Sequence, residues 1–180
     1  MRFISYLFMV IAVVVMSGCA TMTESECATA DWHDVGYKDG RNGKPRDYMQ
    51  ERRTDCAKSG YALDEKKYQA GRDQGIAQYC TAENGRSEGL KGHPYLDACP
   101  AQLERDFLAP YRAAKRVYDA QEKVDELNRQ SDHLTHQLKK EKQGSKRQGI
   151  RQELREIDDK LSDARKDLRH EENRLHDLKL

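Results

Sequence analysis

The sequence predicts an all-α protein: a small disulfide-stapled helical head followed by a long antiparallel coiled-coil hairpin. Three observations predict this. Glycine pairs four residues apart recur three times between residues 36 and 89. Four cysteines punctuate the same stretch, and an even number of cysteines in an exported chain is typical of disulfides. Beyond residue 117, apolar residues repeat at alternating spacings of three and four, as in a heptad seam.

Composition limits the size of the core. Of 180 residues, 37% are hydrophobic and 35% are charged, which argues against a large buried core. Lys and Arg number 32 against 31 Asp and Glu, and the charges are interspersed. This balance excludes the basic excess of a typical nucleic-acid-binding protein, so we expect no nucleic-acid partner.

The first 18 residues have the features of a signal peptide. Arg2 is followed by an apolar run from Phe3 to Met16 and then by Ser17-Gly18-Cys19. The run is shorter than the roughly 20 apolar residues that span a bilayer. An uncleaved anchor, or an ordinary signal peptide with an incidental cysteine, remains the alternative.

The end of this segment is more specific. Val15-Met16-Ser17-Gly18-Cys19 resembles the lipobox of bacterial lipoproteins, which implies that Cys19 is lipidated and becomes the first mature residue. By the same resemblance, Ala20 implies the periplasmic face of the outer membrane. Each buried CH₂ of an acyl chain contributes about 0.8 kcal/mol, so several chains make a stable anchor. We expect residues 19–28 to form a polar tether.

The remaining four cysteines allow three pairings. We favour Cys27–Cys56 with Cys80–Cys99, because both loops are local and each surrounds a glycine element. Each bridge is expected to contribute about 3 kcal/mol. A metal site is the alternative, but no Cys-x-x-Cys pair exists, and His33 and His93 lack zinc-ligand spacing. We therefore expect no metal and no cofactor.

The head, residues 29–118, is expected to contain four short helices. The first begins near Trp32 after a cap at Thr29 or Asp31, and the second covers residues 46–58 and ends before Gly60. The third follows an Asp64 cap and reaches Cys80. The fourth covers residues 85–91, with Asn84 as its cap and Gly92 as its stop.

Glycine inside a helix costs about 1 kcal/mol relative to alanine. Retaining so many predicts a compensating close approach of helix backbones, with aromatic side chains packed over the flat faces. The glycines assigned to this packing are Gly36, Gly40, Gly43, Gly71, Gly75, Gly85, Gly89 and Gly92. The alternative is a glycan-binding surface, for which the candidate stacking residues are Trp32, Tyr37, Tyr68, Tyr79 and Tyr95.

The combined spacing of these residues resembles one family. The motifs are Asp31-Trp32-x-x-x-Gly36-x-x-Asp39-Gly40-x-x-Gly43, Tyr68-x-x-Gly71-x-x-x-Gly75-x-x-x-Tyr79-Cys80, Asn84-Gly85-x-x-x-Gly89-x-x-Gly92 and Tyr95-x-x-x-Cys99-Pro100. Over about residues 19–118 they are similar to the bacterial lipoproteins of the domain of unknown function 2799 family. The resemblance implies an envelope lipoprotein and supplies no catalytic residues.

Residues 119–180 carry two heptad seams in different phases. Pro100 suits the first turn of a helix, whereas Pro110 is expected to kink or break it near residues 106–110. A turn within residues 143–149 then gives two antiparallel helices about 50 Å long. A continuous helix that dimerises in parallel is the alternative. The seams are Val117, Ala120, Val124, Leu127, Ser131, Leu134 and Leu138, then Ile150, Leu154, Ile157, Leu161, Ala164, Leu168, Glu171, Leu175 and Leu178.

These features favour a non-enzymatic structural or interaction lipoprotein that binds an envelope protein through its coiled coil. A glycan- or peptidoglycan-binding head is the second hypothesis. An enzyme ranks third: Asp31, His33, Asp34 and Asp39 cluster in sequence, but no nucleophile accompanies them and we expect them to face solvent. His133 with His136, and Glu172 with His176, are not expected to form a metal site. The oligomeric state is left open.

Overall fold

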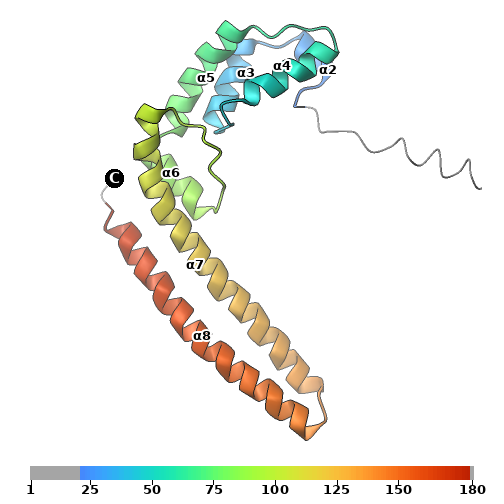
Figure 1. Cartoon of the computed structure of the whole chain (residues 1–180), viewed down its shortest axis with the longest axis vertical. Helices are drawn as coiled ribbons and strands as arrows, with labels where there is room; N and C mark the ends of the chain where they lie inside the picture. Colours follow the sequence, from blue (N-terminus) through green and yellow to red (C-terminus); the bar gives the residue numbers. More distant parts are fainter. Residues whose placement is uncertain (1–20, 179–180) are drawn as a thin grey trace, which may run out of the picture. The chain divides into compact units, whose positions relative to one another are not determined.

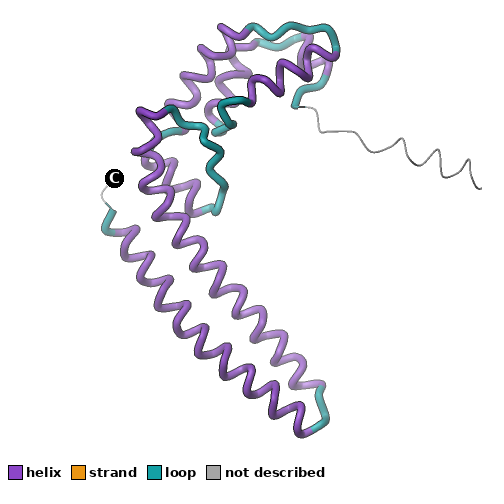
Figure 2. Tube along the Cα trace, viewed as in Figure 1, coloured by secondary structure: helices purple, strands orange, loops and turns teal. Residues whose placement is uncertain are grey.

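The computed structural model describes residues 21–178, and within them every regular element is a helix (Figure 1, Figure 2). This confirms the all-α prediction. The signal peptide and Cys19 lie outside the described residues. No helix in the described part has the length and apolarity needed to cross a bilayer. The helices are α2 (Glu24–Ala28), α3 (Trp32–Arg41), α4 (Tyr48–Lys58), α5 (Glu65–Tyr79), α6 (Ala82–Leu90), α7 (Ala101–Lys140) and α8 (Gly144–His176).

The chain divides into two compact units, unit 1 up to Gly75 and unit 2 from Ile76 onward. This division differs from the single head of residues 29–118 that the sequence suggests. The physical reason is that each disulfide closes within one unit, and that α7 continues without a break into the hairpin.

Side-chain caps and glycines set the helix ends of unit 1. Asp31 caps α3 by accepting hydrogen bonds from the backbone N–H groups of His33 and Asp34. Asp64 caps the start of α5 by accepting from the N–H of Lys67 at 3.1 Å. Gly43 and Gly60 have φ of 63° and 81°, the left-handed conformation that glycine adopts without strain.

Within unit 1, α3 and α5 approach each other backbone to backbone at their glycines. A Cβ placed on Gly36 would lie 2.0 Å from the carbonyl oxygen of Tyr68. One on Gly71 would lie 1.9 Å from the carbonyl oxygen of His33, and one on Gly75 would lie 2.1 Å from that of Tyr37. Any side chain larger than hydrogen would therefore force the two helices apart.

The core of unit 1 is small and surrounds the Cys27–Cys56 disulfide. This bridge and Cys80–Cys99 in unit 2 are the same two pairs that the local-loop argument favours. Aromatic side chains fill the remaining space, as expected over flat glycine faces. The buried members are Met22, Cys27, Trp32, Cys56 and Tyr68.

The expected tether is folded in its described part. Met22 is buried, with its sulfur 3.9 Å from the sulfur of Cys56. α2 follows it and begins with a capping box between Thr23 and Glu26. The tether prediction is wrong for residues 21–28, because a buried methionine and a capped helix attach this segment to the unit.

In unit 2, α6 packs its glycines against the first part of α7. Cβ atoms on Gly85 and Gly89 would lie 2.3 Å and 2.4 Å from the carbonyl oxygens of Phe107 and Tyr111. The expected Asn84 cap is wrong. Thr81 caps α6, while the Asn84 side chain donates to the carbonyl of Tyr79, because the helix begins three residues earlier than expected.

An aromatic cluster beside the second disulfide forms the core at this end of α7. The rings of Tyr79 and Phe107 stack at 5.1 Å, and those of Phe107 and Tyr111 at 5.7 Å. The hydroxyl of Tyr95 accepts a hydrogen bond from the N–H of Cys99 and donates to Glu104. This cluster accounts for the aromatic residues on either side of Cys99.

Pro110 is expected to kink or break the helix, and the prediction of a break is wrong, because α7 continues through this residue. Proline removes one hydrogen bond to the carbonyl four residues earlier. That carbonyl belongs to Asp106, an exposed residue, and can be hydrated. Pro110 itself is buried beside Phe107 and Tyr111, whose packing stabilises the helix at this point.

α7 and α8 lie side by side as an antiparallel hairpin (Figure 1). The connection is residues 141–143, shorter and earlier than the expected turn at 143–149, because Gly144 and Gly149 both lie within α8. Arg147 satisfies the end of α7 by donating to the carbonyls of Leu138 and Glu141 at 2.6 Å and 2.8 Å. The seam buries Val124, Leu127, Leu134, Ile157, Leu161 and Ala164.

Replacing Gly71 by Ala tests the close approach of α3 and α5. The new methyl group would meet backbone that no rotamer change can move, so we expect unit 1 to lose about 2 kcal/mol or more. Gly149→Ala is the matched control: nothing lies within 4 Å of that position, and Ala should stabilise the helix by up to about 1 kcal/mol. Urea unfolding followed by circular dichroism measures the unfolding free energy of both variants. If Gly71→Ala stabilised the protein as much as Gly149→Ala, the close packing of α3 and α5 would be contradicted.

Candidate functional site

Both flanks of the hairpin seam carry grooves that are open to solvent. In an antiparallel pair, residues that directly follow seam positions meet on one flank, and residues that directly precede them meet on the other. Asn128 and Arg165 follow seam positions and define the first flank. Lys123 and Lys160 precede seam positions and define the second flank.

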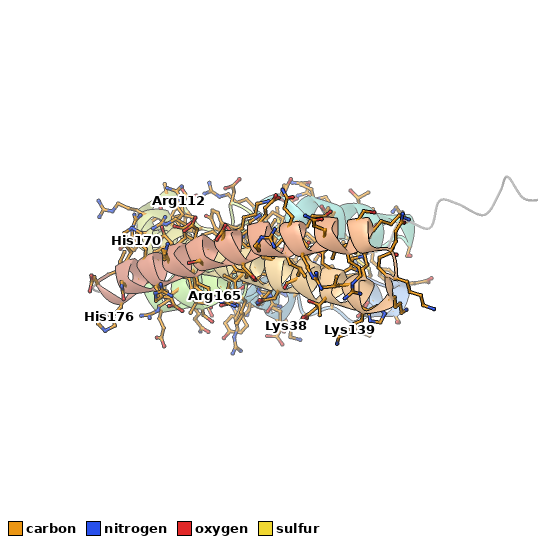
Figure 3. All side chains as sticks on the ribbon, turned by 90° about the horizontal axis from the view of Figure 1, so that it is seen from below. Lys38, Arg112, Lys139, Arg165, His170 and His176 are labelled. Atoms are coloured by element: carbon orange, nitrogen blue, oxygen red, sulfur yellow. A yellow bond between two sulfur atoms is a disulfide. The ribbon has the colours of Figure 1, made fainter. Side chains whose placement is uncertain are left out.

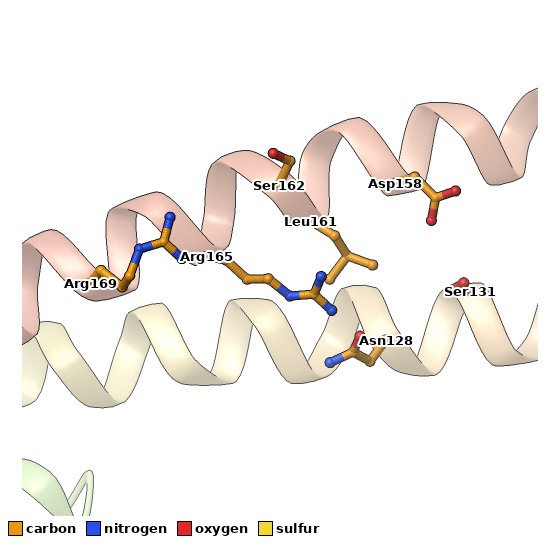
Figure 4. A pocket seen from close by; sticks show the side chains of 7 residues that line it. All are labelled: Asn128, Ser131, Asp158, Leu161, Ser162, Arg165 and Arg169. Carbon is orange, nitrogen blue, oxygen red and sulfur yellow. The ribbon is translucent and has the colours of Figure 1, made fainter.

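The first flank holds one groove of about 480 Å³. Arg165 extends from α8 toward Asn128 of α7, whereas Ser162 points away from α7 (Figure 4). Of the lining side chains, Leu161 alone is apolar. The groove is lined by Asn128, Ser131, Asp158, Leu161, Ser162, Arg165 and Arg169.

The second flank holds two consecutive grooves with apolar floors. The one of about 410 Å³ includes Leu134 and Ile157, and the one of about 370 Å³ includes Ala120 and Ala164. Charged residues of both signs rim them. Together they follow residues 120–134 of α7, a length of about 20 Å along the helix axis.

Exposed charged side chains cover much of the hairpin surface, as Lys139, Arg165, His170 and His176 illustrate (Figure 3). One charge within the predicted seam has a specific partner. Glu171 accepts from Nε of Arg116 at 2.8 Å across the two helices. This hydrogen bond lowers the pKa of Glu171, so the pair stays ionised in the neutral range.

The four candidate acid–base residues are not brought together as a site. Asp31 caps α3, and Asp34 is exposed. Asp39 is only 2% exposed, so the prediction that it faces solvent is wrong. Its position seven residues after Trp32 and three after Gly36 places it on the buried face of α3, a signal that the sequence contained.

Asp39 is the centre of a buried polar network in unit 1. Its two carboxylate oxygens accept from Nε and Nη2 of Arg52 at 2.5 Å and 2.7 Å. The Tyr68 hydroxyl donates to the same carboxylate at 2.8 Å. Burial and this hydrogen bond to Asp39 raise the pKa of Tyr68 well above its usual value. Every oxygen therefore has a partner, which is what a buried carboxylate requires.

Arg52 also connects this network to the start of the described chain. Burial opposes its charge, but the hydrogen bonds with Asp39 outweigh that effect and raise its pKa. Its Nη1 donates to the carbonyl of Thr21 at 3.0 Å. Both the N–H and the hydroxyl of Thr21 donate to Oδ2 of Asp55, at 2.7 Å and 2.9 Å. Thr21 is thus fixed to α4 by three hydrogen bonds to charged groups.

Most of the candidate stacking residues belong to the core. Trp32, Tyr68 and Tyr79 are 8%, 0% and 8% exposed, so a glycan could reach their faces only after unfolding. Tyr37 and Tyr95 are half-buried, and the hydroxyl of Tyr95 is engaged with Cys99 and Glu104. The five rings do not form one accessible platform.

The packing glycines mostly occupy helix contacts. Gly36, Gly71, Gly75, Gly85 and Gly89 each face the backbone of a neighbouring helix. Gly92 ends α6 with φ of 72°, and a Cβ there would lie 2.4 Å from the ring of Tyr118. Gly40 is buried in α3 and Gly43 follows its end. Among residues 21–178, no three His, Cys, Asp or Glu side chains gather where they could hold a metal ion.

Glycine-packed helices, two disulfides and a coiled-coil hairpin define a class of small, all-helical, disulfide-linked proteins. Residues 31–116 match the family described as protein of unknown function (DUF2799). The match confirms the resemblance predicted from the glycine and cysteine spacing. Neither a curated protein nor a solved structure matches the chain.

Removing the Asp39 carboxylate tests the buried network. Asp39→Ala would leave the largely buried guanidinium of Arg52 without its counter-charge, and we expect a loss of about 3 kcal/mol in unfolding free energy. Asp163→Ala removes one partner of an exposed pair with Lys166 and should change stability by no more than about 0.5 kcal/mol. Thermal unfolding compares the stability of the two variants. If Asp39→Ala lost no more stability than Asp163→Ala, the stabilising role of the buried network would be contradicted.

The attachment of Thr21 should be lost in acid. The hydrogen bond from Lys58, followed by those from Thr21, lowers the pKa of Asp55 from its usual 3.8 to about 2. A lowered pKa means that the stabilisation is fully present above the usual value and is lost as pH falls through about 2. The Thr21 amide resonance should therefore hold its position at pH 4 and titrate near pH 2. Lys58→Ala should move that titration to higher pH; an unchanged midpoint would contradict the assignment.

Proposed function

We propose that the protein is a non-enzymatic interaction lipoprotein of the bacterial envelope. Lipidated Cys19 anchors it at the periplasmic face of the outer membrane, and its hairpin binds an envelope protein. The lipobox resemblance at residues 15–19 supports the anchor. Two disulfides support an oxidising compartment such as the periplasm.

The observation that carries the interaction is the second flank of the hairpin. A seam with apolar residues only at alternating spacings of three and four is narrow, and it leaves the edges of Leu134 and Ile157 at the floor of a groove. Ala120 and Ala164 continue this floor with small side chains. A partner helix can lie there and turn the two-helix pair into a three-helix bundle.

The charged rim of the second flank supports a partner helix that carries charges of both signs. Lys123 and Lys160 stand on either side of the alanine groove, and Asp163 and Asp167 accompany them. A helix with apolar residues at heptad spacing and mixed charges beside them complements this surface. The first flank, with its single apolar lining residue and two arginines, is the less suitable of the two.

Site-specific crosslinking in living cells tests this proposal. A photoreactive amino acid at Lys123 or Arg129 on the second flank should give one discrete protein adduct. The same group at Asn128 or Ser162 on the first flank is the matched control and should give little. Equal labelling of both flanks would contradict a helix bound on the second flank.

Ala120→Glu should abolish the adduct at Lys123, because a carboxylate would then fill the apolar groove. A point variant tests the groove more cleanly than a deletion of residues 119–180, which would remove most of the hairpin. Ala113 and Ala114 pack against Leu175, so the deletion would also expose a buried cluster. An adduct that persists in Ala120→Glu would exclude this groove as the binding surface.

A further inference from the structure

Thr21, the first described residue, is held against α4 by hydrogen bonds. Its N–H and hydroxyl donate to Asp55, and its carbonyl accepts from Arg52. Met22 follows directly and is 8% exposed, in contact with the disulfide sulfur of Cys56. Unlike the expected tether, this segment cannot lengthen without breaking three hydrogen bonds and exposing a core residue.

Covalent geometry limits the distance between this fixed point and the anchor. Cys19 and Thr21 are two residues apart, and two residues span at most about 7 Å in any conformation. The interfacial layer on each side of a bilayer is about 5–8 Å thick. If Cys19 carries acyl chains in the bilayer, Thr21 must lie within the headgroup layer or at its outer edge.

A specific face of unit 1 surrounds Thr21. A groove of about 360 Å³ lies beside it and is lined by five polar or charged residues: Thr21, Gln50, Glu51, Thr54 and Asp55. Gln50, Glu51 and Thr54 are exposed along α4. We name these residues the Thr21 face. Its hydroxyl, amide and carboxylate groups suit a hydrated polar layer better than a hydrocarbon interior.

We infer that the Thr21 face lies against the phospholipid headgroups, held there by the short connection between Cys19 and Thr21. The partner is the lipid surface itself. The inference rests on the proposed lipid anchor and adds an orientation to it: unit 1 is seated on the bilayer by one defined face.

Charge does not supply this docking. Residues 21–28 and α4 together carry Glu24, Glu26, Glu51 and Asp55 against Arg52, Arg53 and Lys58. Such a near-neutral surface gains little from anionic lipid, for which clusters of basic residues are typical. Seating should therefore persist at high salt and on zwitterionic membranes.

Fluorescence quenching tests the orientation. A fluorescent amino acid is placed at Gln50 of the full lipoprotein, which is then reconstituted into phosphatidylcholine vesicles containing lipids with a nitroxide on the headgroup. We expect strong quenching that is the same at about 0.05 M and about 0.5 M NaCl. These two concentrations give weak and strong screening of electrostatic interactions. The comparison variant carries twelve Gly and Ser residues between Ala20 and Thr21.

The inserted linker has a root-mean-square length of about 20 Å, so quenching at Gln50 should fall several-fold. Equal quenching in the two proteins, or none in the unmodified one, would overturn the inference. Quenching that disappears at high salt would also overturn it, because electrostatic attraction would then replace the tether.

Two further measurements separate this inference from the anchor that it requires. Mass spectrometry of the N-terminal peptide and flotation with the vesicles report lipidation of Cys19. A lipidated protein that floats but is not quenched leaves the proposed anchor intact and rejects the orientation. A protein that carries no lipid rejects both.

Discussion

Close approach of helix backbones at glycine is the constraint on which both units depend. In unit 1 Gly36 of α3 and Gly71 and Gly75 of α5 each face a carbonyl of the other helix, and in unit 2 the α6 glycines Gly85 and Gly89 face carbonyls of α7. This arrangement gives up helix propensity in exchange for a short interhelical distance. With so little apolar surface available, one disulfide per unit and a few buried aromatic rings complete each core.

The same packing explains why the buried polar side chains of unit 1 are hydrogen-bonded to one another. Helices this close bring Asp39 of α3 within reach of Tyr68 on α5, and Arg52 of α4 completes the pairing. Arg52 then extends to the carbonyl of Thr21, so that the fold of the unit and the position of its N-terminal segment share one side chain. The attachment that the proposed membrane orientation requires is therefore part of the structural core.

Much of the fold could be predicted, because its determinants are local in sequence. Glycine spacing, caps such as Asp31 and the local cysteine loops identify the helices and bridges of the head, and the phase break between the two seams identifies the hairpin. The attachment of Thr21 to Asp55 could not be predicted, since it joins residues 34 apart through side chains common on any surface. The hairpin grooves escaped prediction as well, because they depend on the register of α7 against α8.

The most direct test of the close-packed fold is a set of nuclear Overhauser effects in the isotopically labelled protein. Close packing places the Gly36 α-protons beside the N–H of Arg72, and those of Gly71 beside the N–H of Tyr37, since Cβ atoms at those glycines would each lie 3.0 Å from the amide nitrogen. Strong cross-peaks between both pairs are the predicted result. Their absence in a protein whose α3 and α5 are otherwise helical would contradict the account.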